Sequence, residues 1–268
     1  MNRFQLGIVL ETTGLPVRQA LAAASRLGVA GVQVDAVGDL APDRLGETGR
    51  RAFRNLLKSY NLELTAVHCP LRRGLDAAEH QQQRIEHVRK AMQFAFDLGP
   101  RIVVAPMPKV PTDPASPRAV TLRETLLDLG GFGDRVGVRL ALEGGLDPGE
   151  ATRDYLAAFD TGGLAVNFDP ANFLFNGHDP LKSLTAFAGS VIHTHARDGR
   201  SATLSGGSKE VPVGAGDIEW MAYVATLEAV EYRGYLVVDR ESGENRFADV
   251  AAGVKFLRRF VPAASGPF

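Results

Sequence analysis

The sequence has little of several features that would each point to a special class of protein. It contains one cysteine, Cys69, so no disulfide can form within the chain, and a reducing compartment is the simplest setting. No run approaches the ~18 consecutive apolar residues that a membrane-spanning helix needs. The first ten residues also turn polar too soon for a signal peptide. We therefore expect a cytoplasmic protein that has no membrane segment.

An excess of basic residues is also missing. Lys and Arg number 30 and Asp and Glu number 31, which gives a formal net charge of −1. Surfaces that bind nucleic acid or anionic membranes normally carry a basic excess, so we expect neither kind of partner. The chain has 268 residues, of which 45% are hydrophobic and 23% charged, as in an ordinary globular protein. It is long enough to bury a core without disulfides.

What the chain does have is a regular alternation of strand and helix patterns. Short runs rich in Val, Ile and Leu predict eight strands buried on both faces, as in a parallel sheet. These strands are predicted at residues 4–10, 31–35, 62–68, 101–105, 137–142, 164–168, 190–195 and 234–239. Helical patterns lie near residues 16–27, 47–60, 80–98, 118–130, 149–159, 179–188, 217–230 and 246–260. Asp217 is the predicted N-cap of the helix near 217–230.

Eight strands that alternate with eight helices predict an α/β fold, a single (β/α)8 TIM barrel. An open doubly wound sheet uses the same local units and is the alternative. No linker divides the chain, so we assign residues 1–261 to the barrel and 262–268 to a C-terminal tail.

Four strand ends carry side chains of the kind that bind metals. Glu143, Asp169, His195 and Asp239 end strands five to eight, at spacings of 26, 26 and 44 residues. A βα repeat spans ~30 residues, so these side chains belong at one level, at the end of the barrel where TIM-barrel active sites lie. Each one alone could be a helix cap or a salt-bridge partner. Together they predict a shared divalent cation, because burying unpaired carboxylates is costly.

The segments around these residues are specific in sequence. They are 141–143 (ALE), 167–172 (NFDPAN), 193–198 (HTHARD), 211–217 (VPVGAGD) and 238–241 (VDRE). Over nearly the whole chain the sequence resembles the sugar phosphate isomerase/epimerase family of xylose isomerase-like TIM barrels. That group also includes tagatose and psicose 3-epimerases, inosose dehydratase and endonuclease IV. The resemblance is strong for fold and metal and weak for substrate, because the metal site is shared across many reactions.

The resemblance implies that Glu143, Asp169, His195 and a strand-eight carboxylate hold one divalent metal. It also implies that the first and last of these shuttle the proton of a sugar. The family usually has glutamate where this chain has Asp239, which is shorter by about 1.5 Å. Asp239 or Glu241 could fill that role, because both would point to the same side of a strand. An oxygen-rich set with one histidine suits Mn²⁺, Mg²⁺ or Co²⁺, with Zn²⁺ as the alternative.

Several further residues are candidates for substrate binding. Asn172 stands where epimerases and endonuclease IV often have histidine, and it can bind a sugar hydroxyl but is a poor metal ligand. His68 ends strand three, and Glu11 follows strand one and could line the mouth or cap a helix. His193 could support His195 or sit as a core histidine. The remaining candidates are the arginines Arg197 and Arg72, which could clamp an anionic group or be solvated.

The first hypothesis for function is a metal-dependent isomerase or epimerase of a ketose or sugar phosphate. It would work through an enediolate, with Glu143 and Asp239 or Glu241 as base and acid. A dehydratase or lyase acting on an inosose or 3-keto-glycoside begins with the same proton loss. A non-catalytic sugar-binding barrel and an endonuclease IV-like enzyme are further alternatives, and Asn172 and the net charge argue against the nuclease. The expected partner is a small sugar or polyol, and a homo-oligomer is left open.

Overall fold

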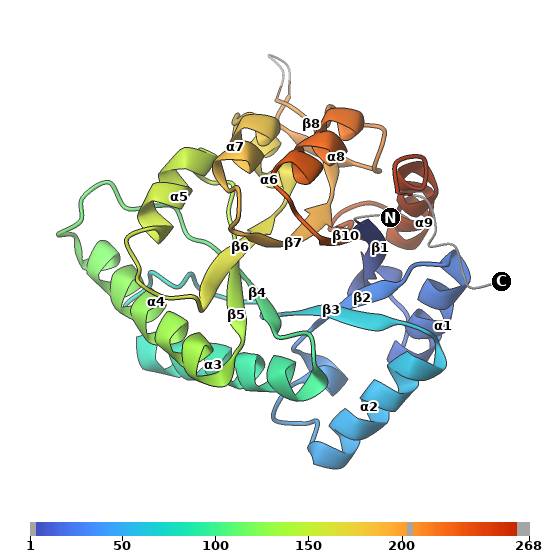
Figure 1. The fold of residues 1–268 in the computed structure, drawn as a ribbon, viewed down its shortest axis with the longest axis horizontal. Coiled ribbons are helices and arrows are strands. Elements are labelled where there is room, and N and C mark those ends of the chain that lie inside the picture. Colours follow the sequence, from blue (N-terminus) through green and yellow to red (C-terminus); the bar gives the residue numbers. More distant parts are fainter. Residues whose placement is uncertain (1–3, 203–205, 262–268) are drawn as a thin grey trace.

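The computed structural model describes residues 4–202 and 206–261, and it forms the predicted barrel (Figure 1). Eight parallel strands close into a ring in chain order. They are β1 (Phe4–Val9), β2 (Gly31–Asp35), β3 (Glu63–His68), β4 (Ile102–Pro106), β5 (Arg139–Glu143), β6 (Leu164–Phe168), β7 (Val191–Ala196) and β10 (Gly234–Val238). The last strand pairs with the first, with Phe4 opposite Gly234 and Ile8 opposite Val238. The TIM-barrel prediction is therefore confirmed, and the open sheet is wrong.

Helices surround the strands on the outside of the barrel (Figure 1). They are α1 (Val17–Leu27), α2 (Glu47–Ser59), α3 (Gln81–Leu98), α4 (Pro117–Val136), α5 (Gly149–Leu156), α6 (Pro170–Phe175), α7 (Pro180–Ala186), α8 (Trp220–Ala229) and α9 (Arg246–Leu257). Fully buried aliphatic side chains such as Leu21, Val88 and Leu126 belong to one apolar core shared by strands and helices. Each such side chain stabilises the fold by about 1.5–3 kcal/mol. This core holds the strand ends, and hence the site residues, in place.

The structure differs from the predicted elements near the carboxyl ends of the strands. The prediction of Asp217 as a helix cap is wrong, because α8 begins at Trp220 and the Asp217 carboxylate instead accepts a hydrogen bond from the Ser201 amide. A short helix, α6, was not predicted. The loop after β7 contains a two-stranded antiparallel hairpin of β8 (Asp198–Arg200) and β9 (Lys209–Val211). Short 3₁₀ turns, η1 (Leu10–Thr13) and η2 (Gly38–Leu40), follow β1 and β2.

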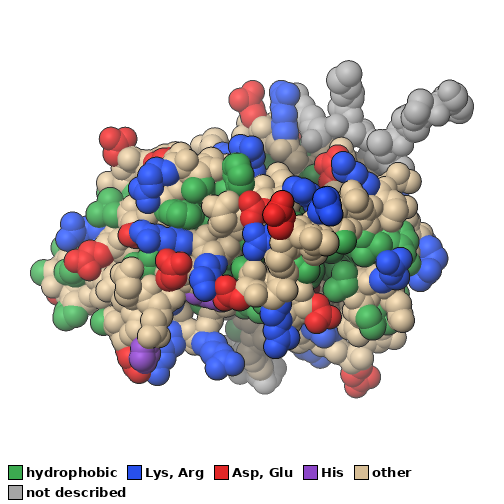
Figure 2. Space-filling model, turned by 90° about the horizontal axis from the view of Figure 1, so that it is seen from below, with side chains coloured by type: hydrophobic (Ala, Val, Ile, Leu, Met, Phe, Trp, Pro, Cys, Tyr) green, Lys and Arg blue, Asp and Glu red, His purple; other side chains and the backbone are tan. Residues whose placement is uncertain are grey.

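The outer surface carries side chains of both charges. Figure 2 shows Lys and Arg interspersed with Asp and Glu over the face seen from below. Within residues 4–202 and 206–261, no helix is long and apolar enough to cross a membrane. The predicted tail at 262–268 lies outside the described residues.

Candidate functional site

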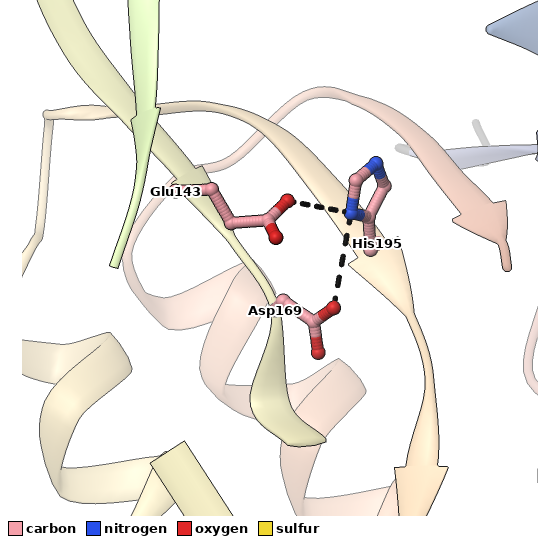
Figure 3. Close-up of side chains that lie close together, drawn as sticks. All are labelled: Glu143, Asp169 and His195. Carbon is pink, nitrogen blue, oxygen red and sulfur yellow. Dashed lines mark ion pairs between the residues drawn. The ribbon is translucent and has the colours of Figure 1, made fainter. Parts of the chain in front are cut away.

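Three of the predicted ligands converge at the carboxyl end of the barrel (Figure 3). Glu143 ends β5, Asp169 directly follows β6 and His195 lies near the end of β7. One ligand atom from each lies within 4.8 Å of the others. The His195 Nδ1 atom is 2.8 Å from Glu143 Oε2 and 3.8 Å from Asp169 Oδ2. Two carboxylates and one imidazole at this spacing are a donor set that fits a divalent cation. We call these three residues the triad.

Asp169 serves two purposes at once. Its Oδ1 atom accepts hydrogen bonds from the amides of Ala171 (2.9 Å) and Asn172 (3.4 Å), which makes it the N-cap of α6. Its Oδ2 atom is the oxygen that lies toward His195. Asp169 Oδ1 is therefore the helix cap, while Oδ2 lies in the cluster of atoms that could bind a metal, and the role of Asp169 as a ligand stays a prediction.

His195 is oriented by a residue from the other side of the barrel. Its Nε2 atom lies 2.9 Å from Oε1 of Gln33, a carbonyl oxygen that can only accept. When the ring is neutral, its proton is therefore on Nε2, and Nδ1 faces the two carboxylates with the Asn167 side-chain amide 3.3 Å away. A metal-binding histidine is commonly fixed in this way by a hydrogen bond at its second nitrogen.

Asn167 connects the triad to the barrel interior. Its side-chain amide donates to Glu143 Oε2, and its Oδ1 atom accepts from His193 Nδ1 at 2.8 Å. His193 Nε2 lies 3.2 Å from the Thr65 hydroxyl, so both ring nitrogens of this histidine are used inside the barrel. Burial, followed by the charge of His195, lowers the pKa of His193 well below its usual value, so His193 is neutral. It thus meets the triad through Asn167 and through an edge-on contact with the His195 ring, whose centroid is 5.5 Å away.

The triad is strongly coupled in charge. Burial alone would lower the pKa of His195, but the carboxylates of Glu143 and Asp169 raise it to about 10. Burial alone would likewise raise the pKa of Asp169, but Arg197 and His195 lower it to about 2. The charge and hydrogen bond of His195 lower the pKa of Glu143 in the same way against its burial. Both carboxylates are therefore ionised at neutral pH, while the His195 ring is protonated without a metal, so a bound cation would replace its Nδ1 proton.

Arg197 sits almost fully buried beside the triad. Its guanidinium nitrogens lie 2.9 Å from Asp169 Oδ2, 3.3 Å from Glu210 Oε1 and 3.0 Å from Glu241 Oε2. The same group donates to the Asn172 side-chain oxygen at 3.2 Å. One buried cation thus joins β6, the β8–β9 hairpin and the loop after β10.

Glu210 on β9 fixes the loop that carries the strand-eight carboxylates. Its two oxygens accept from the amide of Glu241 (3.0 Å) and from both the amide (2.7 Å) and the hydroxyl (2.6 Å) of Ser242. Glu210 was not predicted as part of the site. Nothing in the sequence marked it, because its partners lie 31 and 32 residues away along the chain.

The strand-eight carboxylates lie beside the triad. The Asp239 Oδ2 atom is 4.0 Å from Arg197 Nε, while its Oδ1 atom accepts from the Arg240 amide at 2.7 Å. Burial raises the pKa of Asp239, and the charges of His195 and Arg197 only partly oppose the shift. Glu241 is more exposed, and burial raises its pKa to about 6. Among the described residues neither belongs to the cluster of converging ligand atoms, and the assignment of the fourth ligand stays a prediction.

A cavity of about 150 Å³ opens between the strand ends. Its lining includes Glu143, His195 and Asp239 together with Glu11, Gln33 and His68. Pockets for drug-sized ligands are larger, about 300–1,000 Å³. The volume and the polar lining therefore suit a small polar molecule.

The other predicted substrate residues take different places. His68 lines the cavity, and its Nδ1 atom lies 2.9 Å from Asp35 Oδ1. Asn172 donates to Glu143 Oε1 at 3.0 Å, so it touches the triad directly. Gly145 allows this approach, since a Cβ atom there would lie 2.5 Å from Asn172 Cβ. Arg72 is exposed in the loop after β3 and is outside the cavity lining.

The family model described as "Xylose isomerase-like TIM barrel" matches residues 21–260. The chain belongs to this family. No curated protein matches its sequence. The solved structures that resemble it include a xylose isomerase domain protein from Planctomyces limnophilus, at 24% identity and a TM-score of 0.82 over 91% of this chain and 94% of that one.

Two other solved structures carry the same fold at lower identity. A D-allulose 3-epimerase from Methylomonas sp., in complex with D-allulose, has 16% identity and a TM-score of 0.74 over 97% and 98% of the two chains. A 3-keto-D-glucoside 4-epimerase from E. coli has 16% identity and a TM-score of 0.76 over 96% and 99%. At such identities the likeness shows the fold.

Asp198, in the segment 193–198 of this xylose isomerase-like barrel, has a structural role. The Asp198 carboxylate accepts from the amides of Gly199, Gly214, Gly216 and Ile218 and, at 2.8 Å, from the Trp220 indole. It therefore closes the loop between β8 and α8, and it positions the hairpin that presents Glu210 to Arg197.

Proposed function

We propose that the protein is a metal-dependent isomerase or epimerase that acts on a ketose or sugar phosphate through an enediolate. One observation carries the proposal. Glu143 and Asp239 line the same cavity, and one ligand atom from each of Glu143, Asp169 and His195 lies within 4.8 Å of the others. Two carboxyl groups in one cavity beside a cluster of metal-type ligands are suited to metal-assisted proton transfer, with one group as base and the other as acid.

The triad supplies the ligands, and Asp239 is the proposed fourth. Mn²⁺, Mg²⁺ or Co²⁺ suits the set best, with Zn²⁺ as the alternative. When bound, such an ion polarises a carbonyl oxygen and makes the neighbouring C–H more acidic. The buried negative charge of Glu143 and Asp169, which Arg197 balances only in part, supports this assignment.

The proton steps are assigned to the carboxyl groups. Glu143, which is ionised, takes the proton from the carbon next to the carbonyl group. Asp239, which lines the same cavity, is the proposed acid that returns a proton, and Glu241 is the alternative for this role. General acid–base catalysis of this kind contributes about 10²–10⁴ in rate.

The remaining candidates are proposed to position the substrate. His68 reaches the cavity directly. Three others act through a neighbour that they orient. Asn172 bonds to Glu143 and Arg197 bonds to Asp169. His193 bonds to Asn167. Arg72, which is exposed, would only meet an outer group such as a phosphate. The solved relatives named as D-allulose 3-epimerase and 3-keto-D-glucoside 4-epimerase act on sugars by their names, which supports a sugar substrate here.

The test combines metal analysis with a deuterium-exchange screen. The metal-loaded protein is incubated in D₂O with a panel of ketoses, inososes and 3-keto-glycosides, and the products are read by mass spectrometry and NMR. We expect about one metal per chain and deuterium at the carbon next to a carbonyl group, without loss of mass. Loss of water or of an aglycone would replace the proposal by a dehydratase or lyase. Metal binding without exchange in any sugar would favour a non-catalytic barrel.

A further inference from the structure

Glu11 is a carboxyl group in the cavity wall that the proposed mechanism does not use. It lies in η1, directly after β1. Its Oε1 atom accepts a hydrogen bond of 2.8 Å from the Asp35 amide. Its Oε2 atom is buried and has no hydrogen-bond partner among the described residues. A buried polar atom normally has a partner, so an unpaired oxygen beside a cavity calls for a ligand.

His68 stands in the same wall with a second free atom. Its Nδ1 atom is bonded to the Asp35 carboxylate, which can only accept, so Nδ1 carries a proton. No hydrogen bond joins its Nε2 atom to another residue in the part of the chain that the structure describes. Glu11 and His68 both line the cavity. In the closed ring of strands, β1 lies four places from β5 and β3 four places from β7, so this wall is opposite the triad.

We propose that Glu11 is a substrate-binding and specificity-determining residue. Its neutral carboxyl group donates a hydrogen bond to an oxygen of a polyhydroxylated substrate. This inference rests on the proposed function, because it concerns the end of the sugar that lies away from the triad. His68 Nε2 provides the adjoining contact. The two walls then bind the two ends of one small molecule within about 150 Å³.

The surroundings of Glu11 keep its carboxyl group protonated below about pH 7. Burial, followed by the nearby charge of Asp35, raises its pKa to about 7, while the Asp35 amide and His68 oppose the shift. Because Oε1 accepts from an amide, the proton belongs on Oε2, the atom that has no partner. The charged and titratable groups that face Glu11 are Asp35, His68, Glu143, His195, Asp239, Arg240, Glu241 and, from α9, Arg246.

A pair of variants isolates this contact. Glu11→Gln keeps the shape, the acceptor for the Asp35 amide and a donor in place of the Oε2 hydroxyl, but it cannot ionise. Glu11→Ala removes both. We expect Glu11→Ala to raise the KM for the ketose roughly 10- to 100-fold, the range for losing one or two hydrogen bonds. Glu11→Gln should keep KM near the wild-type value at pH 6. Asp39→Asn is the matched control, since Asp39 is an exposed acid in η2 on the same side of the barrel.

The decisive measurement is KM as a function of pH. The metal-loaded wild type and each variant are assayed from pH 6 to 9 with the ketose that exchanges fastest among D-fructose, D-allulose and D-tagatose. Groups shared by wild type and Glu11→Gln cancel in the ratio of their KM values. The wild-type KM divided by the Glu11→Gln KM should rise above about pH 7, as the wild-type carboxyl group loses its proton, and should reach roughly 10- to 100-fold by pH 9.

The failures of the two proposals can be told apart. Wild-type turnover with an unchanged KM in Glu11→Ala overturns the inference and leaves the proposed function standing. An equal loss in Glu11→Gln and Glu11→Ala also overturns it, because the group would then act as an anion. No exchange by the metal-loaded wild type with any of the three ketoses overturns the inference together with the proposed reaction on these sugars.

Discussion

Two sets of the same three residue types lie on opposite walls of the barrel mouth. Each set contains one glutamate, one aspartate and one histidine at or just after three consecutive strands. The triad is Glu143, Asp169 and His195, and the opposite set is Glu11, Asp35 and His68. Within the described residues only the triad brings three ligand atoms within 4.8 Å of one another. The triad and the opposite set therefore differ in geometry and not in residue type.

The hydrogen-bond partners of the two sets make the difference. In the triad, backbone amides bind Asp169 Oδ1 and Gln33 binds His195 Nε2, so Asp169 Oδ2 and His195 Nδ1 converge with Glu143 Oε2. Arg197 and Asn167 also donate hydrogen bonds to these converging atoms. In the opposite set, His68 bonds to Asp35 through the same nitrogen, Nδ1, that His195 turns toward its carboxylates. Arg197 also keeps Asp169 ionised, whereas burial raises the pKa of Glu11 to about 7. The partners thus make one wall suitable for the proposed cation site and the other for the proposed hydrogen-bond donor.

The largest expected effect is on catalysis by the triad wall. Glu143→Gln should lower the rate of exchange next to the carbonyl group by about 10²–10⁴, because the amide cannot take the proton. Rates are compared at saturating metal and sugar. Glu47→Gln, at the exposed start of α2, is the control and should be unchanged. Full activity in Glu143→Gln would show that the base lies elsewhere, for example on the opposite wall.

The next effect is on stability. Arg197→Gln leaves the carboxylates of Asp169 and Glu210 buried without their cation. We expect the free energy of unfolding of the metal-free protein to fall by about 3–5 kcal/mol, as measured by urea denaturation. Saturating Mn²⁺ should restore part of the loss, since it would neutralise Asp169. Arg51→Gln, at an exposed position of α2, should leave the free energy of unfolding nearly unchanged. An equal loss in this control would show that the buried ion pairs of Arg197 have no special effect on stability.

Mn²⁺ affinity distinguishes the triad from the opposite set, because variants that disturb one or the other should affect it differently. Gln33→Leu removes the acceptor that fixes His195, and we expect Mn²⁺ to bind about 10- to 100-fold more weakly. Asp35→Asn, in the opposite set, should leave Mn²⁺ affinity within about twofold. Isothermal titration calorimetry measures both, with Gln83→Leu on the exposed face of α3 as the control. Weaker binding in Asp35→Asn than in Gln33→Leu would reverse the assignment of the walls.

A smaller effect is the pH dependence of the metal-free protein. The folded-state pKa of His195, about 10, lies above its ordinary value of 6.5. Its protonation therefore stabilises the fold fully below pH 6.5, and this contribution is lost as the pH rises from 6.5 to 10. The stability difference between wild type and His195→Gln should shrink over that range in urea denaturation. A difference that stays constant would mean that the ring is neutral without metal.

The sequence contained the barrel and the triad because both depend on local patterns. Apolar runs define strands, and a polar residue at a strand end is visible without knowing its neighbours. Glu143, Asp169 and His195 were found in this way. Gln33 and Asn167 were not, because their partners depend on which residues face each other across the closed barrel.

The loop after β7 was the least predictable part. In sequence Asp217 resembles a helix cap. In the structure the Asp198 carboxylate accepts hydrogen bonds from the Ile218 amide and the Trp220 indole, and α8 begins at Trp220. The position of Glu210 depends on that arrangement. Charge pairs that form between loops distant in the sequence leave no local pattern.

The central claim is that the triad, and not the opposite set, holds the metal. Crystals grown with Mn²⁺ and measured on both sides of the manganese absorption edge test it most directly. We predict one anomalous peak per chain, within bonding distance of Glu143, Asp169 and His195, and no peak beside Glu11, Asp35 and His68. A peak at the opposite set, or no peak at the triad in protein that retains stoichiometric Mn²⁺, would contradict the account.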